Sequence, residues 1–331
     1  MSEITATVCV DALGGDEPPE VVLAGVERAL SEDEHLKVLL VGFEDVVTPF
    51  AQAHERCDAV TCTQSIAMDE HPVEAIRTKR DSSIVVGCRQ VRSGAAQAFF
   101  SAGSTGACMA AATLGIGRAK GVDRPALASV LPGATPTVML DLGANADCKT
   151  LNIVQYARMG VAYSRIVVGV REPRVGLLNI GSEDTKGSMA AQERFAALRE
   201  QVPEFVGNAE GTDILGDRFD VIVTDGFTGN VALKTLEGTA KFAMRMLKEA
   251  LTSSTAAKLA ALTLKPALSG IKTRLSGDRM GGAVLLGVKG VVVIGHGATS
   301  PEAVKNGTLV AARAVRDGLL DDVARQIGSQ G

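Results

Sequence analysis

The amino-acid sequence predicts an α/β fold: a doubly wound, mainly parallel sheet in an α/β/α sandwich, with a protruding helical excursion. Short apolar, β-branched runs alternate with helical patterns along the 331 residues, and most of these runs end in a small or acidic turn. This alternation is typical of βαβ units and of a parallel sheet. No linker rich in Pro, Gly or Ser divides the chain, so we expect residues 1–331 to form a single domain.

The predicted strands are seven short segments: Thr5–Val10, Lys37–Val41, Phe99–Ser101, Thr137–Asp141, Val175–Ile180, Phe219–Asp225 and Val291–Ile294. A helix is expected after the first strand, because Pro18 and Pro19 suit a first helical turn and apolar residues recur at helical spacing from Val22 to Leu30. A closing helix over Pro301–Ile327 completes the series.

Residues 239–274 break this alternation, because they show a helical pattern without a strand. Apolar and basic residues are mixed in their second half: Leu262, Leu264, Leu268 and Ile271 with Lys258, Lys265, Lys272 and Arg274. We interpret the segment as a helical excursion from the sheet. It suits a dimer contact or a lid, a dock for a carrier protein, or a helix that lies on a membrane surface.

The composition argues against several classes of function. The chain has 34 basic and 38 acidic residues, a net charge of -4, 3% aromatic residues and no Trp. This indicates neither a basic excess nor a platform for stacking bases, so we expect no nucleic-acid partner. The start MSEITATVCV does not resemble a signal peptide, and no apolar run of about 20 residues occurs, so a cytoplasmic protein is expected.

The motifs predict neither a metal nor an organic cofactor. The six cysteines form no C-x-x-C pair, which favours reduced and mostly buried thiols. The first turn, DALGGD, lacks the G-x-G-x-x-G spacing of a nicotinamide site, and no Walker sequence is present. A G-x-S-x-G elbow is also missing, so no serine nucleophile is expected.

Six small, Gly-rich and polar turns are the best candidates for a site: Asp11–Asp16, Ser101–Ala107, Asp141–Lys149, Asn179–Gly187, Thr224–Lys234 and Gly295–Ser300. Ligands of parallel α/β sheets bind outside the carboxyl ends of the strands, so we expect these turns to converge along one edge of the sheet. Gly lets backbone N–H groups approach a ligand, and a following helix adds its positive end. The turns therefore indicate anion binding.

The turn SAGSTGA is the strongest single candidate for a phosphate site, with Gly103, Ser104, Thr105 and Gly106 opening an Ala-rich helix. Ordinary helix capping explains such a turn as well. Three lysines at equivalent places after strands strengthen the interpretation: Lys149, Lys186 and Lys234. In the other turns, a group of acidic and Gly residues is expected to organise the loops, with divalent metal binding as the alternative: Asp11, Gly14, Gly15, Asp16 and Asp141.

Seven stretches resemble, in the same order, the phosphate acyltransferase of bacterial phospholipid synthesis, the PlsX family: VDALGGDEPPE, SAGSTGACMAA, GVDRPALASVLP, LDLGANADCK, LLNIGSEDTKG, VIVTDGFTGNVALKTLEG and GGAVLLGVKGVVVIGHG. They cover the chain from the first predicted strand to about Gly297. Family members usually have Asn where Ser104 stands, and Ser keeps a small polar side chain there.

The resemblance implies that acyl carrier protein thioester and inorganic phosphate react reversibly to give acyl phosphate and free carrier protein. It also implies a homodimer, and a functional link to the membrane glycerol-3-phosphate acyltransferase that consumes the acyl phosphate. A peripheral position at the inner face of the membrane would suit that link. Acyl carrier protein is acidic, so its dock should be basic, and two clusters qualify: Arg77, Lys79 and Arg80, and Lys265, Lys272 and Arg274.

The chemistry needs no covalent nucleophile, because phosphate itself attacks the thioester. Holding the two reactants together can supply about 7–11 kcal/mol, and N–H groups, Asn or Lys can stabilise the oxyanion. We assign phosphate binding to Gly103–Gly106 with Lys186, carbonyl and oxyanion contacts to Asn145, Lys149, Asn230 and Lys234, and proton relay to Asp225 and His296. For His296, a structural role in capping the last helix is an equal alternative.

Cys108 and Cys148 are the thiols nearest the expected site, but a reactive thiolate would need nearby positive charge, so no acyl-cysteine is expected. Three other functions stay open. These are a phosphotransacetylase-like enzyme that uses acyl-CoA, a decarboxylating dehydrogenase, and a non-catalytic module that binds acyl groups or carrier protein.

Overall fold

The computed structural model describes residues 5–255, 257–258, 261 and 281–328. These residues form an eleven-stranded sheet in the order β3-β2-β1-β4-β11-β10-β5-β6-β9-β7-β8. The strands are β1 (Ala6–Asp11), β2 (Leu36–Gly42), β3 (Cys57–Thr61), β4 (Ala98–Ser101), β5 (Ala126–Pro132), β6 (Pro136–Leu140), β7 (Val175–Leu178), β8 (Phe205–Ala209), β9 (Val221–Val223), β10 (Ala283–Leu286) and β11 (Val291–Ile294).

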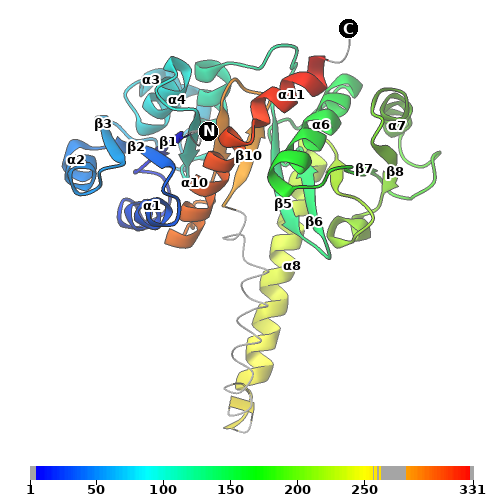
Figure 1. The fold of residues 1–331 in the computed structure, drawn as a ribbon. Helices are drawn as coiled ribbons and strands as arrows, with labels where there is room; N and C mark the ends of the chain where they lie inside the picture. The colour runs from blue at the N-terminus through cyan, green and yellow to red at the C-terminus, as the bar shows by residue number, and fades with distance from the viewer. Residues whose placement is uncertain (1–4, 256, 259–260, 262–280, 329–331) are drawn as a thin grey trace.

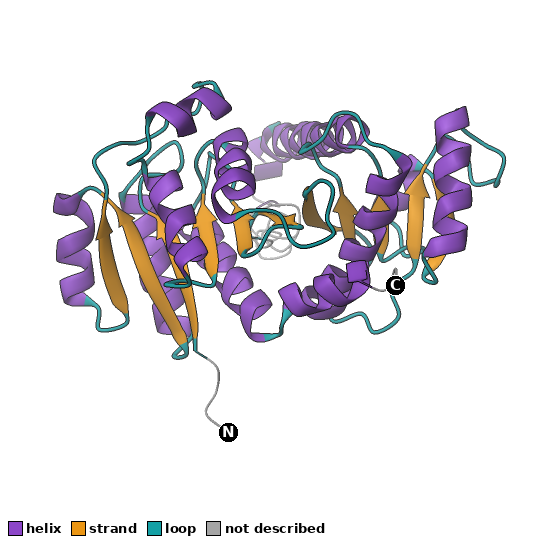
Figure 2. Ribbon diagram, turned by 90° about the horizontal axis from the view of Figure 1, so that it is seen from above, coloured by secondary structure: helices purple, strands orange, loops and turns teal. Residues whose placement is uncertain are grey.

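Helices cover both faces of the sheet, which confirms the predicted α/β/α sandwich (Figure 2). One face carries α1 (Glu20–Glu32), α2 (Glu44–Ala53), α6 (Thr150–Tyr163), α7 (Met189–Gln201), α10 (Pro301–Arg316) and α11 (Leu319–Gly328). The other carries α3 (Pro72–Thr78), α4 (Ser83–Ser93), α5 (Thr105–Ala111), η1 (Ala112–Ile116) and η3 (Gly211–Leu215). A short π-helical turn, η2 (Ser164–Val168), follows α6.

The predicted strands all exist, but four further strands complete the sheet: β3, β5, β8 and β10. Two of these, β5 and β10, lie at its centre, where the ladders β11–β10, β10–β5 and β5–β6 are antiparallel. Every other ladder is parallel. The sheet therefore consists of two parallel groups, β3-β2-β1-β4-β11 and β6-β9-β7-β8, that run in opposite local directions.

Sheet twist largely cancels this reversal in space. Adjacent strands rotate by roughly 20–25°, so the six ladders between β1 and β9 accumulate roughly 120–150°. A strand that is locally antiparallel and rotated by that amount points nearly the same way as the first. In Figure 2 the outer strands on both sides accordingly point toward the top of the view.

The closing helix is divided in two. The predicted single helix over Pro301–Ile327 ends at Arg316 and restarts at Leu319, because Gly318 adopts a positive φ of 75° that an L-residue rarely adopts. The second helix, α11, then packs against α6 on the other half of the sheet.

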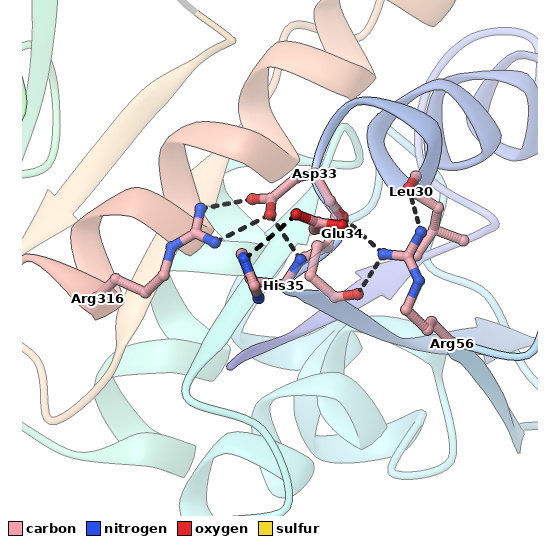
Figure 3. Close-up of polar contacts among 7 residues, drawn as sticks. Leu30, Asp33, Glu34, His35, Arg56 and Arg316 are labelled. Atoms are coloured by element: carbon pink, nitrogen blue, oxygen red, sulfur yellow. Dashed lines mark hydrogen bonds and ion pairs between the residues drawn. The ribbon is translucent and has the colours of Figure 1, made fainter. Parts of the chain in front are cut away.

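A cluster of arginines fixes the ends of α1 and α10 to each other (Figure 3). The Arg316 guanidinium at the end of α10 makes two hydrogen bonds to the Asp33 carboxylate, which holds the pKa of Asp33 below its ordinary value. Arg56, which precedes β3, donates to the carbonyl oxygens of Leu30, Asp33 and Leu36. The last carbonyls of α1 are thereby satisfied by a side chain.

The predicted helical excursion begins earlier than expected. Helix α8 runs from Gly226, directly after β9, to Thr252, and it extends far beyond the sheet (Figure 1). Of the residues singled out in this segment, Lys258 is described and exposed, whereas Leu262, Leu264, Lys265, Leu268, Ile271, Lys272 and Arg274 lie outside the described residues. None of the described helices combines the length and apolar character needed to cross a membrane.

Candidate functional site

The loops after β1, β4 and β11 meet and form a first loop cluster, defined as residues 11–16, 101–106 and 295–300. The Asp16 amide donates to the Gly297 carbonyl at 2.8 Å, which joins the first and third loops. The first and second loops touch so closely that a Cβ at Gly14 would lie 2.7 Å from the Gly103 nitrogen. Glycine at position 14 is therefore required by packing.

Asp11 stands at the centre of the first loop cluster. Its carboxylate accepts hydrogen bonds from the Ser101 hydroxyl at 2.7 Å and from the Leu13 amide at 3.0 Å. The Ser101 hydroxyl in turn accepts from the Gly103 amide at 3.0 Å. Burial raises the pKa of Asp11, and hydrogen bonds from Ser101 and Ser83 oppose this rise. These contacts are those of a residue that holds two loops in place.

The start of α5 keeps donors that the protein itself does not use. Ser104 is the N-cap residue and is 6% exposed, yet its side chain makes no capping hydrogen bond. Within the described ranges, the amides of Ser104, Thr105 and Gly106 have no acceptor. The hydroxyl of Thr299 is also buried without a partner in this part of the chain. Such donors at a helix start are available to an anion.

The loops after β6, β7 and β9 form a second loop cluster, defined as residues 141–149, 179–187 and 224–230. Asp141 is fully buried and its carboxylate accepts five hydrogen bonds, from the amides of Leu127, Gly143, Ala144 and Asn145 and from the Asn145 side chain. The third loop packs on it so tightly that a Cβ at Gly229 would lie 2.0 Å from the Asp141 carbonyl oxygen. Asp141 thus holds the second loop cluster together.

Asn145 has a different role from the predicted oxyanion contact. Its Nδ2 donates to the Pro125 carbonyl at 2.7 Å and to the Asp141 carboxylate at 3.0 Å. Both amide hydrogens are then occupied, and only the Oδ1 acceptor remains. In this arrangement neither side-chain amide hydrogen is free for the predicted oxyanion contact, which stays a prediction.

Asp225, the predicted proton relay, has structural partners in this arrangement. It caps α8 by accepting from the Thr228 amide at 2.9 Å, and it pairs with Arg194 at 3.1 Å. Burial alone would raise the pKa of Asp225, but the bonds from Thr228 and Arg194 outweigh burial and lower that pKa. The carboxylate therefore stays ionised and is a weak proton acceptor.

Arg194 is a site residue that the sequence did not indicate. It projects from α7, donates to Asp225 at 3.1 Å and to the Cys148 carbonyl at 2.9 Å, and so joins two loops of the second cluster. A pocket of about 290 Å³ opens beside it, lined by Ala146, Asp147, Cys148, Arg194, Asp225, Phe227 and Thr228. A single Arg within a helix belongs to no recognisable sequence motif when its partners are distant in sequence.

The predicted lysines lie in or beside the second loop cluster, and none contacts the first in the described structure. Lys186 is exposed and lies 3.6 Å from Glu183, and Lys234 pairs with Glu237 at 2.9 Å. Lys149 is the N-cap residue of α6 and is exposed. Asn230 is exposed too, with its side chain beside Gly143. All four side chains are therefore accessible to solvent.

His296 does not cap the last helix, because Ser300 does so by accepting from the Ala303 amide. The Nδ1 atom of His296 accepts from the Ala298 amide at 3.2 Å within its own loop, and the ring is exposed. A neutral ring in this arrangement carries its proton on Nε2. The structural alternative for His296 is therefore local turn formation.

The cysteines lack the environment of a reactive thiolate. Burial raises the pKa of Cys108 to about 12. Burial also raises the pKa of the half-buried Cys148, and the nearby carboxylates of Asp141 and Asp225 add to this rise. In the described part of the chain, no three His, Cys, Asp or Glu side chains gather in a way that could hold a metal ion.

The six predicted turns thus form two loop clusters rather than one row along a single edge. The expectation that all six turns meet in one group was wrong, because the three central ladders are antiparallel. Strands β10 and β5 lie between β11 and β6 and so separate the two clusters. Both clusters still lie at the carboxyl ends of parallel strands. The sheet twist described above turns these ends toward the same side of the molecule (Figure 2).

The chain is similar to known proteins over nearly its full length. Residues 6–321 match a family model described as "Fatty acid synthesis protein". A phosphate acyltransferase of Heliobacterium modesticaldum is 46% identical over 327 residues, covering 97% of both chains. One of Anoxybacillus flavithermus is 42% identical, again over 97% of both chains.

Solved structures of other enzymes share the fold. A phosphotransacetylase from Streptococcus pyogenes aligns with a TM-score of 0.60 and 15% identity over 94% of both chains. The EutD phosphotransacetylase from Staphylococcus aureus gives 0.59 and 17%, again over 94% of both chains. A 4-hydroxythreonine-4-phosphate dehydrogenase from Klebsiella pneumoniae gives 0.51 and 12%, covering 96% of this chain and all of its own. At such identities the likeness concerns the fold alone.

Proposed function

The chain belongs to the family described as fatty acid synthesis protein, whose curated relatives are phosphate acyltransferases, and from this premise we propose that it moves a fatty acyl group from acyl carrier protein to inorganic phosphate. The family membership makes the chain an acyltransferase that works with phosphate. The carrier protein as donor is our proposal. The observation that carries it is the full-length match to the family.

The proposed reaction is a direct displacement on the thioester. A phosphate oxygen attacks the carbonyl carbon, and the carbonyl electrons move onto the oxygen of a tetrahedral intermediate. The intermediate collapses, the C–S bond breaks, and the products are acyl phosphate and the thiolate of the carrier protein, which takes up a proton. Every step is reversible. No cysteine of the described site has a lowered pKa, which supports attack by phosphate itself.

We place the phosphate at the start of α5, because the amides of Ser104, Thr105 and Gly106 and the small hydroxyl of Ser104 lack partners there in the described structure. Gly103 contributes differently, since its amide already donates to Ser101 and shapes the turn. Several N–H groups aimed at one point bind an oxyanion strongly in a site shielded from water.

We place the thioester carbonyl between the two loop clusters, on the side of the exposed side chains of the second. Lys186, Lys149, Lys234 and Asn230 are the candidates to stabilise the oxyanion, because all four are exposed and the ion pairs of Lys186 and Lys234 are weak surface ones. The Nε2–H of His296 is the candidate proton donor to the leaving thiolate. Asn145 and Asp225 hold the loops.

The proposed product also suggests an assembly and a location. Helix α8 extends from the body and exposes large apolar side chains, among them Phe242 at 52% and Met246 at 54%. We propose that a second copy covers this helix in a homodimer, which light scattering after gel filtration would detect. We further propose a cytoplasmic enzyme, peripheral at the inner membrane face, that supplies acyl phosphate to glycerol-3-phosphate acyltransferase in phospholipid synthesis.

Incubation of the purified protein with acyl carrier protein thioester and phosphate tests the proposal directly. The expected result is one acyl phosphate, trapped as a hydroxamate, for each carrier thiol released, and no release without phosphate. Faster turnover of acyl-CoA than of the carrier thioester would favour the phosphotransacetylase-like alternative. Tight acyl binding without product would favour the non-catalytic module.

Lys186→Ala is expected to lower phosphate-dependent turnover at least about 100-fold, because the loss of a positioned cation at a developing oxyanion costs about 3 kcal/mol. Lys37→Ala is the matched control, since Lys37 is an exposed lysine on β2 far from either loop cluster. Near wild-type activity of Lys186→Ala would remove Lys186 from the site.

A further inference from the structure

Four arginines along one side of α4 keep charges that no carboxylate neutralises. Arg77 lies in the last turn of α3, Arg80 lies in the connection from α3 to α4, and Arg89 and Arg92 lie on α4 itself. All four are exposed. In the described ranges none of them has an Asp or Glu partner, whereas the neighbouring Lys79 pairs with Glu70 at 2.6 Å. The sequence-based cluster of Arg77, Lys79 and Arg80 therefore loses Lys79 and gains two residues of α4.

Three of these side chains, those of Arg80, Arg89 and Arg92, each donate one hydrogen bond to a backbone carbonyl. Arg80 Nε donates to the Arg77 carbonyl at 3.3 Å, and Arg89 Nη2 donates to the Arg80 carbonyl at 3.0 Å. Arg92 Nη1 donates to the Gly115 carbonyl at 3.2 Å. Each guanidinium has five N–H donors, so one bond to a carbonyl fixes its position and leaves donors for a carboxylate.

The four residues form one surface, because these bonds connect them in sequence and Arg89 and Arg92 are one helical turn apart. Most acidic residues close to these arginines already have other partners. Asp81 accepts from the amide and hydroxyl of Thr63, and Glu70 is taken by Lys79. Glu74 on α3 is the exposed carboxylate that remains close by. We call this surface, residues 77, 80, 89 and 92, the arginine surface.

The arginine surface is attached to the first loop cluster. Helix α3 packs on α5, and a Cβ at Gly106 would lie 2.5 Å from the Pro72 side chain. Helix α4 begins beside Asp11, where Ser83 contributes a hydrogen bond to that carboxylate. A partner seated on the arginine surface would therefore approach the proposed phosphate site at the Arg77 and Arg80 end.

We propose that the arginine surface is the docking site for an acidic carrier protein, a proposal that rests on the proposed function. An acidic helical surface is complementary to fixed guanidinium groups, which bind carboxylates in forked pairs. The net charge of the chain is -4, so an unneutralised basic strip is a local exception to its overall charge. Such a strip raises the association rate of an oppositely charged partner and fixes its orientation.

The test is the double variant Arg80→Glu/Arg89→Glu, with Arg171→Glu/Arg313→Glu as the matched control of equal charge change. Arg171 and Arg313 are exposed and lie on other elements, in the loop before β7 and on α10. At low ionic strength, kcat/KM for the acyl carrier protein thioester should fall at least about tenfold in the first variant only. The KM for phosphate and the kcat at saturating donor should stay within about twofold, and the melting temperature should match that of the control.

A milder pair, Arg80→Gln/Arg89→Gln, should show a smaller loss of the same kind, and the difference from wild type should shrink at high salt because exposed charges are screened. Equal kcat/KM in the Glu variant and the control would overturn the inference. Loss of binding to vesicles rich in anionic lipid, with kcat/KM for the carrier thioester unchanged, would overturn it too and identify a membrane contact. No turnover of the carrier thioester by the wild-type protein would instead contradict the proposed function.

Discussion

The two loop clusters have the same arrangement of strand, aspartate and turn, but they differ in which hydrogen-bond donors stay without an acceptor in the described structure. In each, a parallel strand ends in a buried aspartate that holds a Gly-rich turn. Asp141 accepts five hydrogen bonds, and the amide of Asn145 is fully occupied beside it. Asp11 accepts fewer, and the amides that start α5 stay without acceptors in the described structure. The second cluster thus uses its backbone donors internally and presents exposed side chains, whereas the first leaves backbone donors at the start of α5.

The largest expected effect follows from replacing the two aspartates. Asp141→Asn removes acceptor capacity for several buried amides and should lower the free energy of unfolding by about 3 kcal/mol or more, because bonds to charged groups contribute about 1.5–3 kcal/mol each. Asp11→Asn should cost about 1 kcal/mol, since burial already disfavours its charge. Urea unfolding of both variants measures the difference. Equal losses would contradict the contrast between the clusters.

The next effect concerns Arg194, which joins two loops of the second cluster. Arg194→Ala leaves Asp225 without its ion pair and should cost about 2 kcal/mol of stability and at least about tenfold in kcat. Arg194→Lys should restore part of the kcat, because one ammonium group keeps the contact to Asp225 but cannot also reach the Cys148 carbonyl in the same geometry.

Arg199→Ala is the control for Arg194, since Arg199 lies on the same helix and forms an exposed ion pair with Asp184 at 2.8 Å. It should change stability by less than about 1 kcal/mol and leave kcat unaltered. If Arg194→Ala behaved like Arg199→Ala in both measurements, Arg194 would have no part in the site.

A smaller effect is expected at the helix start of the first cluster. Ser104→Ala should raise the KM for phosphate about fivefold with little change in stability, because the hydroxyl makes no capping bond. Ser188→Ala should lower stability by about 1 kcal/mol and leave the KM for phosphate unchanged. The reason is that Ser188 caps α7 by accepting from the Ala191 amide, and this cap is lost. Steady-state kinetics and thermal unfolding together distinguish the two serines.

The smallest expected effect is a difference in pH dependence. The pKa of Asp11 is raised in the folded protein, so the native state binds more protons than the unfolded state above pH 3.8, and Asp11 lowers stability as pH rises through that window. The pKa of Asp225 is lowered, so its contribution is present above pH 3.8 and is lost as pH falls through the folded value.

Acid titration of stability in Asp11→Asn and Asp225→Asn checks these signs. The measured quantity is the stability of each variant minus that of wild type. From acid to neutral pH this difference should become more favourable for Asp11→Asn and less favourable for Asp225→Asn. If stability relative to wild type changed in the same direction with pH in both variants, the direction of the pKa shift given for Asp11 or for Asp225 would be wrong.

Much of the fold was predictable from the sequence, because strand and turn chemistry is local. The predicted segment Val291–Ile294 coincides with β11, and Lys37–Val41 falls within β2. The strands that were missed include β5 and β10, which pair with their sequence neighbours β6 and β11 and with each other over a long sequence distance. The β10–β5 ladder joins segments far apart in sequence, so the division of the six turns into two clusters could not be read from any local pattern.

The sequence predicted which loops carry the candidate site residues, but it predicted the role of each residue less well. Asp11 and Asp141 lie where turn-organising carboxylates were expected, and their hydrogen bonds are those of such residues. Asn145 and Asp225 were assigned to chemistry because of their residue type. Their partners, Pro125 and Arg194, come from other elements, and a single sequence does not reveal contacts of that kind.

The antiparallel ladders at the centre of the sheet fix the spacing between the two loop clusters as well as their direction. Five ladders separate β4 from β9, and each contributes its own rotation. A change of about two degrees per ladder would turn one cluster relative to the other by about ten degrees. Residues in β5 and β10 therefore set how far apart the two loop clusters lie, and substitutions there would change that separation without altering either cluster.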